Sequence, residues 1–350
     1  MAYTDIDKPS DYFNTKLFTG NGSSGHAISG VGFQSDWTWI KNRSAGNSNH
    51  RITDAVRGVT KEIYSDLTAA EATNTNGLTA FGSDGFTVGS NGDYNNNGSA
   101  IVSWNWKANG AGSANTDGDI ASTVSVNTTS GFSIVSYTGN GSAGATVGHG
   151  LGSLCKFIII KRLNSTNDWE IGSTALGWDK HLYFNTGAAN TSSNRWQSTA
   201  PTNSVFYLGP AAGNNASSSP LIAYCFSEKQ GYSKFGSYVG NGNADGTFVY
   251  TGFSPAFVMV KRTNGANSWN IKDNRRNNAS TSFNINPRNA TLLPNDSAAD
   301  QDANALDFLS NGFKNRSTGN DVNNASGSYI YMAFAENPFT SSTGTPVTAR

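Results

Sequence analysis

The sequence predicts an all-β protein of three tandem β-sandwich modules. The chain has 350 residues, which leaves room for two or three domains that each bury a core. It contains 39 glycines, and aromatic residues make up 11% of it. Disordered chains lack aromatic residues, so this composition indicates a folded protein with many turns. Turn residues separate short apolar runs about every 8 to 12 positions, a spacing typical of sandwiches and barrels.

Each module opens with a strand that ends in a Gly-Asn-Gly turn, repeated at intervals of about 100 to 120 residues. We interpret these segments as tight turns that need positive φ, because a phosphate site would require a helix behind them. The interval fits a whole β-sandwich and is too long for a solenoid. The turns are Gly20, Asn21 and Gly22, then Gly139, Asn140 and Gly141, then Gly240, Asn241 and Gly242.

The next element is an apolar strand closed by a lysine, which is Lys41, Lys161 or Lys261. Because these lysines recur at one position, we expect them to protect a strand edge against unwanted pairing. Trp169 and Trp269 each follow a lysine by eight residues, and their equal offsets predict core or inter-module sites. In the first module Asn49 stands at that offset. A strand rich in β-forming residues then closes each module, at 100–106, 221–226 and 329–335.

These landmarks divide the chain. The segment 111–130 is interpreted as a linker or an edge strand, and 55–72 as a short helix inserted in the first module. The second and third modules follow without a gap, so we expect them to pack rigidly and the first to be more mobile. The predicted parts are an N-terminal arm at 1–10, modules at 11–110, 131–230 and 231–340, and a tail at 341–350.

Charge and apolar patterning exclude several functions. Lys plus Arg equals Asp plus Glu at 24 each, so neither nucleic acid nor an anionic membrane is an expected partner. No apolar run reaches the roughly 18 residues of a membrane helix, and residues 1–5 lack the pattern of a signal peptide. Synthesis in a cytoplasm favours free thiols at Cys155 and Cys225 over a disulfide.

The segments 136–141, 157–162, 231–238 and 329–339 resemble a repeat of tail and virion proteins of tailed bacteriophages. The resemblance covers nearly the whole chain and is weakest in the first module, which lacks the tryptophan after its lysine. It implies concanavalin-like jelly-roll modules, similar to laminin-G and SPRY domains. It also implies a place on a virion made in the host cytoplasm, and it supplies no catalytic residues.

The sequence shows no pattern of an enzyme or a fixed metal site. The four histidines are scattered, no nucleophile elbow is present, and Glu228 and Glu336 sit at matching positions after closing strands. We therefore expect no catalytic residues and no cofactor. Ca²⁺ is left open at the acidic segments 93–97, 117–119 and 296–302, which we interpret as solvated turns.

The best ligand candidates lie in the middle of the second module. Trp178 and Trp196 have no counterpart in the other modules, and His181 and Arg195 are near them in sequence. Exposed aromatic planes stack on sugar rings, so these four residues predict a contact with a host glycan.

The sequence therefore predicts a tail fibre or tail-associated adhesin, present in several copies, with other virion proteins and a host receptor as partners. The arm at 1–10 is expected to dock onto a neighbouring virion protein. A head fibre or capsid decoration protein is the alternative. A polysaccharide depolymerase and a free lectin-like module are weaker ones.

Overall fold

The computed structural model describes residues 2–276 and 285–347, and it confirms the all-β prediction. All pairs of named strands are antiparallel. Helical structure in the described residues is limited to a 3₁₀ turn at Pro9–Asp11 and three single turns, α1 (Gly92–Asn95), α2 (Ala212–Asn215) and α3 (Asn320–Asn323). No helix in the described residues is long and apolar enough to cross a membrane.

Three large sheets repeat one strand order. The strand that closes each repeat lies between the strand that opens it and the apolar strand that ends in the repeated lysine. In the first repeat (11–110) the order is β1 (Phe13–Thr19), β9 (Ala100–Trp106), β3 (Trp37–Asn42) and β4 (Arg51–Asp54). In the second (131–230) it is β12 (Phe132–Thr138), β19 (Pro220–Ser227), β14 (Cys155–Arg162) and β15 (Glu170–Ser173). In the third (231–340) it is β20 (Ser233–Val239), β27 (Ser328–Pro338), β22 (Phe253–Arg262) and β23 (Asn270–Asp273).

The second sheet is longer than the others at both edges. Strands β10 (Ser113–Asn115) and β11 (Ser122–Asn127) extend it beyond β12, while β16 (Lys180–Tyr183) and β17 (Thr191–Ser192) extend it beyond β15. The segment 111–130 thus contains edge strands of the second repeat and is not a free linker.

A smaller sheet lies over the outer face of each large sheet. These sheets are β2 (His26–Ser29), β8 (Gly85–Val88) and β7 (Leu78–Gly82); β13 (Ala145–Gly148) and β18 (Val205–Leu208); and β21 (Phe248–Tyr250), β26 (Gly312–Asn315), β25 (Gln301–Leu309) and β24 (Arg288–Thr291). Each encloses a separate outer core with its large sheet.

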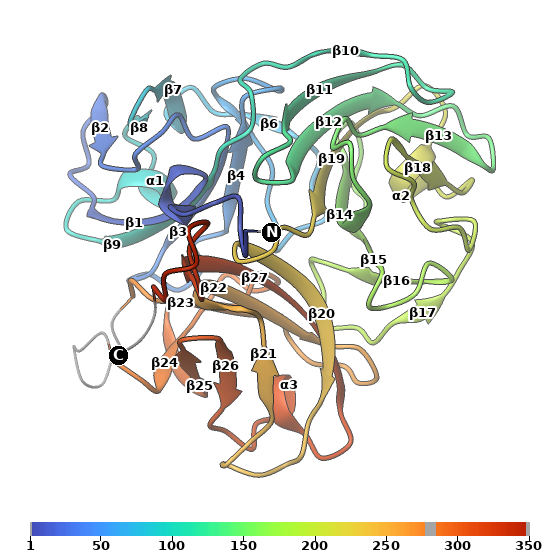
Figure 1. Ribbon diagram of the computed structural model, residues 1–350. Helices are drawn as coiled ribbons and strands as arrows, with labels where there is room; N and C mark the ends of the chain where they lie inside the picture. The colour runs from blue at the N-terminus through green and yellow to red at the C-terminus, as the bar shows by residue number, and fades with distance from the viewer. Residues whose placement is uncertain (1, 277–284, 348–350) are drawn as a thin grey trace.

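The inner faces of the three large sheets meet in a shared core, around which the repeats are arranged (Figure 1). On β14, Phe157 and Ile159 point into the shared core, whereas Ile158 and Ile160 point into the outer core. Because side chains alternate along a strand and both faces are covered, the strand is a continuous apolar run.

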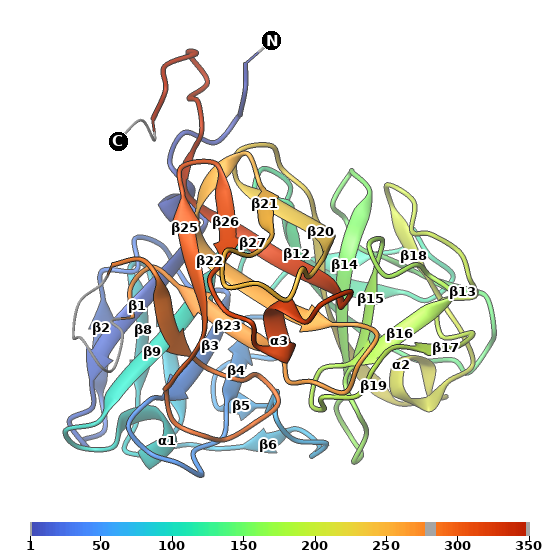
Figure 2. The same ribbon diagram turned by 90° about the horizontal axis from the view of Figure 1, so that it is seen from below.

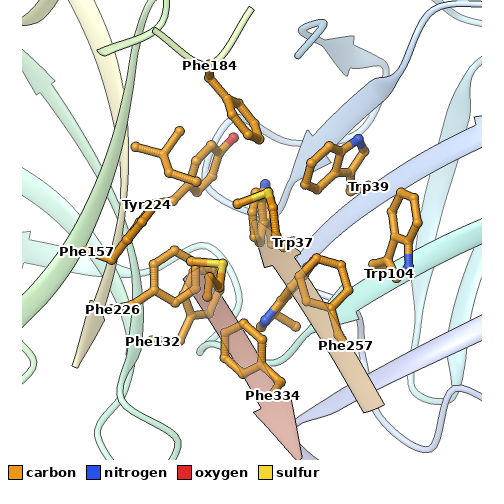
Figure 3. Close-up of a cluster of buried hydrophobic side chains, with 14 of the residues drawn as sticks. Trp37, Trp39, Trp104, Phe132, Phe157, Phe184, Tyr224, Phe226, Phe257 and Phe334 are labelled. Carbon is orange, nitrogen blue, oxygen red and sulfur yellow. The ribbon is translucent and has the colours of Figure 1, made fainter. Parts of the chain in front are cut away.

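Aromatic rings of all three repeats pack together in the shared core, as Figure 3 shows. Trp37 of the first repeat stacks on Tyr224 of the second, with centroids 4.6 Å apart. Phe13 of the first repeat stacks on Phe334 of the third at 5.2 Å. Each such pair adds about 0.5–1.5 kcal/mol beyond burial of its area. The first repeat therefore shares one core with the other two, and its greater mobility stays a prediction.

The helix expected at 55–72 is absent. Gly58 and Thr60 adopt positive φ, 89° and 64°, which a right-handed helix cannot accommodate. Ile63 is buried and bridges to Ile52, and the segment otherwise forms turns and the short pair β5 (Lys61–Glu62) and β6 (Ala72–Thr73). Burial of Ile63 in the shared core outweighs the weak helix propensity nearby.

Both end segments of the described chain project from one face of the molecule (Figure 2). The N-terminal arm packs on its own chain, because Ile6 is buried in the shared core and Thr4 Oγ1 donates to the main-chain oxygen of Gln230 at 2.8 Å. The Ser342 N–H donates to Asp7 Oδ1 at 2.6 Å. These contacts anchor the arm on its own chain, and its docking onto a neighbouring virion protein stays a prediction.

Candidate functional site

Trp178 and Trp196 do not present their rings to solvent. Their exposed fractions are 7% and 1%, and both belong to the outer core of the second repeat. The two rings meet edge to face at 5.7 Å, over Gly172. A Cβ at Gly172 would lie 2.7 Å from either ring, so the missing side chain makes their space. Their proposed role in stacking on a sugar is therefore wrong.

Arg195 and His181 meet at Tyr183. The Arg195 side chain donates to Tyr183 Oη at 3.0 Å and pairs with Glu170 at 2.6 Å, while the His181 ring packs on Tyr183 at 4.8 Å. Burial raises the pKa of Glu170 to about 7, although Arg195 opposes the shift, and burial lowers the pKa of His181 to about 4. Glu170, which the sequence did not single out, is the buried partner of this cluster.

The first repeat has an ion pair at the position equivalent to Glu170, but with the charges reversed. Arg51 is equivalent to Glu170 because it pairs with Ile40 in the sheet register, and Glu170 pairs with Ile160. Arg51 pairs with Glu62 at 2.7 Å, and its guanidinium lies 4.4 Å from the Tyr64 ring centre. In the third repeat Asn270 accepts a hydrogen bond from Asn304 at 2.9 Å. The side chain at this position is thus acidic, basic or an amide in the three repeats. In each repeat it makes a polar contact that stabilises the sheet.

The three lysines are fully buried and lie in strands that have a partner on both sides, so they do not protect a strand edge. Side chains alternate between the two faces of a strand, and each lysine lies on the same face as the residues of its strand that point into the shared core. Each donates to a main-chain oxygen of a neighbouring repeat: Lys41 to Ser297 at 3.1 Å, Lys161 to Thr68 at 2.8 Å and Lys261 to Gly187 at 3.1 Å. These contacts run around the ring of repeats and close it.

The repeated tryptophans also join neighbouring repeats. Both are buried in the shared core, and their indoles donate across the boundary, Trp169 to Tyr64 O at 2.8 Å and Trp269 to Tyr183 O at 3.0 Å. The backbone N–H groups of Trp169 and Trp269 donate to the side chains of Asn185 and Asn295, respectively. In the first repeat, the backbone N–H group of His50 donates to Asp66 in the same way. His50 is thus their counterpart, one residue after the offset that the sequence indicated.

The Gly-Asn-Gly turns are held by buried asparagines that the sequence did not single out. Asn95 Oδ1 accepts from the Asn21 N–H at 2.9 Å, and its Nδ2 donates to Ser23 O and Gly89 O. A Cβ at Gly20 would lie 2.1 Å from Asn96 O, so only glycine fits. The same contacts recur at Asn215 and Asn323. Each asparagine lies five residues before its closing strand, a repeat visible in the sequence.

The acidic segments are engaged by neighbouring side chains and main-chain groups. Asp93 pairs with Arg51, Asp119 accepts from Thr146, and Asp300 pairs with Arg276 at 2.5 Å. Across 2–276 and 285–347, no three His, Cys, Asp or Glu residues are grouped to hold a metal. Cys155 and Cys225 are buried free thiols, as expected.

A groove on the face that carries both end segments is a second candidate site. It has a volume of about 510 Å³, within the roughly 300–1,000 Å³ of ligand sites, and lies between the second repeat, the third repeat and the N-terminal arm. The Tyr250 side chain of β21 is 50% exposed in it, and the Tyr3 hydroxyl donates to Gly252 O at 2.6 Å on its wall. Its charged and polar lining includes Lys156, Glu228, Gln230 and Lys234.

Charges of both signs converge in this groove. Lys234 Nζ donates to Tyr250 O at 3.1 Å and lies 5.1 Å from the Tyr250 ring centre. Burial raises the pKa of Glu228, and Lys234 and Lys156 oppose that shift. The groove therefore combines an exposed aromatic ring with donors and an acceptor.

Comparison with curated proteins and with solved structures finds no match to the chain. A family model described as a domain of unknown function, DUF7483, matches residues 8–338. The match begins before the first repeat and ends at the last large strand, so it spans all three sheets. The chain belongs to the DUF7483 family.

Proposed function

We propose that this protein is a structural component of a bacteriophage particle, a tail fibre or tail-associated adhesin whose three jelly-roll modules attach the particle to a host glycan. The observation that carries the proposal is the groove at Tyr250, where an aromatic ring is exposed beside Lys156 and Glu228. The resemblance of the repeats to phage virion proteins supports the assignment to a virion that is made in the host cytoplasm.

The closed ring of repeats suits a load-bearing part. Three sheets share one core, and lysine and indole donors join each repeat to the next. Pulling on one repeat would therefore have to break polar contacts and apolar packing together. Several copies on a particle would add weak sites to a firm attachment.

Immunogold electron microscopy of particles from cells that carry the gene tests the assignment. Label on the tail supports the adhesin, and label over the capsid supports the alternative, a head fibre or decoration protein. Particles without label, from lysates in which the antibody detects the chain, would refute a virion role.

A depolymerase is the opposing proposal, and the groove lining gives it little support. Glycoside hydrolysis uses two carboxyl groups across the scissile bond. Glu228 is the carboxylate among the described residues that line the groove. We expect no new reducing ends when the protein is incubated with host polysaccharide, and sustained release would establish an enzyme.

A further inference from the structure

We propose that the groove at Tyr250 binds a pyranose ring of a saccharide, with Tyr250 stacking on the sugar and Glu228 and Lys156 bonding its hydroxyls. That the sugar belongs to a host cell rests on the proposed function. The way in which the sugar binds is argued from the residues of the groove alone.

The strand β21 presents the stacking ring. It is an edge strand that pairs with β26, and its side chains alternate, with Val249 buried between the exposed Phe248 and Tyr250. The Lys234 ammonium, 5.1 Å from the Tyr250 ring centre, limits the movement of that ring. A ring held in place loses little conformational entropy when a ligand stacks on it.

Two charged groups of the groove, those of Lys156 and Glu228, are open to a ligand, whereas the Lys234 ammonium is bound to Tyr250 O. Within the described chain, neither Lys156 Nζ nor the Glu228 carboxylate makes a direct hydrogen bond or ion pair. The fully buried Arg276, by contrast, is paired with Asp273 at 2.6 Å, whereas Glu228 is exposed and Lys156 is partly buried. Polar groups that converge on an open groove beside an exposed aromatic ring are typical of a ligand site.

The chemistry of these groups selects a polyol. An ammonium group only donates hydrogen bonds and a carboxylate only accepts them, while a hydroxyl does both. Neighbouring hydroxyls on a sugar can accept from Lys156 and donate to Glu228 while the C–H face of the ring covers Tyr250. A peptide segment offers no such row of hydroxyls, so a saccharide fits best.

The N-terminal arm forms one wall and extends the site. Tyr3 lines the groove and two adjoining hollows of about 600 and 200 Å³. Thr4 lies so close to Gly231 that a Cβ there would approach it to 2.9 Å. The arm therefore packs directly against the main chain at Gly231. A chain of several sugars can continue from the groove along the arm.

The test uses the full chain and immobilised lipopolysaccharides and capsular polysaccharides from a panel of bacterial strains, read by biolayer interferometry. We expect binding to at least one polysaccharide. Tyr250→Ala should weaken it severalfold and up to about tenfold, the value of one lost stacking contact. Glu228→Gln should weaken it severalfold.

Phe248→Ala is the matched control, because Phe248 is 43% exposed on the same face of β21 but is not part of the groove lining. It should bind within about twofold of the parent. Unchanged thermal unfolding of each variant shows that the fold is intact. Equal binding by all variants would overturn the groove assignment, and no binding to any polysaccharide would overturn the saccharide class.

The outcomes separate this inference from the proposed function. A chain that is found on particles and binds sugars independently of Tyr250 refutes the groove and keeps the adhesin. A chain that binds sugars through Tyr250 but is absent from particles keeps the groove and refutes the adhesin.

Discussion

The indole Nε1 of Trp169 lies 2.8 Å from the main-chain oxygen of Tyr64, and this hydrogen bond joins the second repeat to the first. A parallel set of bonds uses the closing strands: Tyr224 donates to Asp54 at 2.8 Å, and Trp104 donates to Asp273 at 3.0 Å. In the third repeat, Met332 takes the equivalent position in the register. The boundary between the second and third repeats thus lacks this bond and relies on apolar packing, Lys261 and Trp269.

Replacing Trp269 with phenylalanine should cost more stability than its size change explains. It removes the indole donor to the main-chain oxygen of Tyr183, a loss of about 1–3 kcal/mol. Trp106→Phe is the matched control, because Trp106 lies in the same core and its indole N–H has no hydrogen-bond partner in the described chain. Urea unfolding of both variants gives the difference. Equal losses would show that the bond to Tyr183 contributes nothing.

The three buried lysines predict a rise in stability above pH 8. Burial lowers the pKa of Lys41, Lys161 and Lys261 to about 8, whereas an unfolded lysine titrates near 10.4. Between these values the unfolded chain binds more protons, so the free energy of unfolding increases with pH until tyrosine ionisation intervenes near pH 10.

Lys261→Met should flatten that rise and lower stability throughout, whereas Lys180→Met, at a partly exposed lysine, should leave it unchanged. Urea unfolding at pH 7.5, 8.5 and 9.5 measures the slope. A parent protein whose stability is constant over this interval would contradict the prediction.

Asn95→Ala should destabilise the first repeat by at least about 2 kcal/mol, because it leaves several main-chain groups of the Gly-Asn-Gly turn without partners. Asn97→Ala, two residues away and exposed, should change stability by less than about 0.5 kcal/mol. Thermal unfolding compares the two. Similar melting temperatures would mean that the turn does not depend on the amide.

Arg195→Met should cost about 3–5 kcal/mol at pH 8, because it leaves the Glu170 carboxylate buried without its cation. Arg195 opposes the rise of the Glu170 pKa, which is about 7 in the parent, so removing the guanidinium raises that pKa further. The loss should therefore be largest at high pH and shrink as the pH falls toward 7, where the buried carboxyl of the variant takes up a proton before that of the parent does. Adding Glu170→Gln should restore most of the stability. A loss that is independent of pH would rule out this coupling.

Local patterns in the sequence predicted much of the fold. Glycine at position 22 and the apolar run at 157–160 determine a turn and a strand through their own chemistry, so these elements could be identified. The ring of repeats depends on contacts between residues far apart in the chain, such as Lys41 with Ser297. For that reason the sequence predicts strand edges for the lysines, whereas the structure buries them between repeats.

The candidate site was harder to predict than the fold. Trp178 and Trp196 look like ligand-binding residues in the sequence, but the space over Gly172 buries them. Tyr250 is one aromatic residue in a β-strand, and its exposure follows from its place on an edge strand. The groove also needs Tyr3, which lies more than 200 residues away in the chain. No local pattern connects the two tyrosines.

Competition for adsorption tests the central claim most directly. Host cells are first incubated with the purified chain, and the fraction of particles that adsorb is then counted by plaque assay. We predict that the parent chain reduces adsorption in proportion to its concentration, while the Tyr250→Ala chain at the same concentrations leaves most adsorption intact. Adsorption that stays unchanged at saturating concentrations of the parent chain would contradict a role in host attachment.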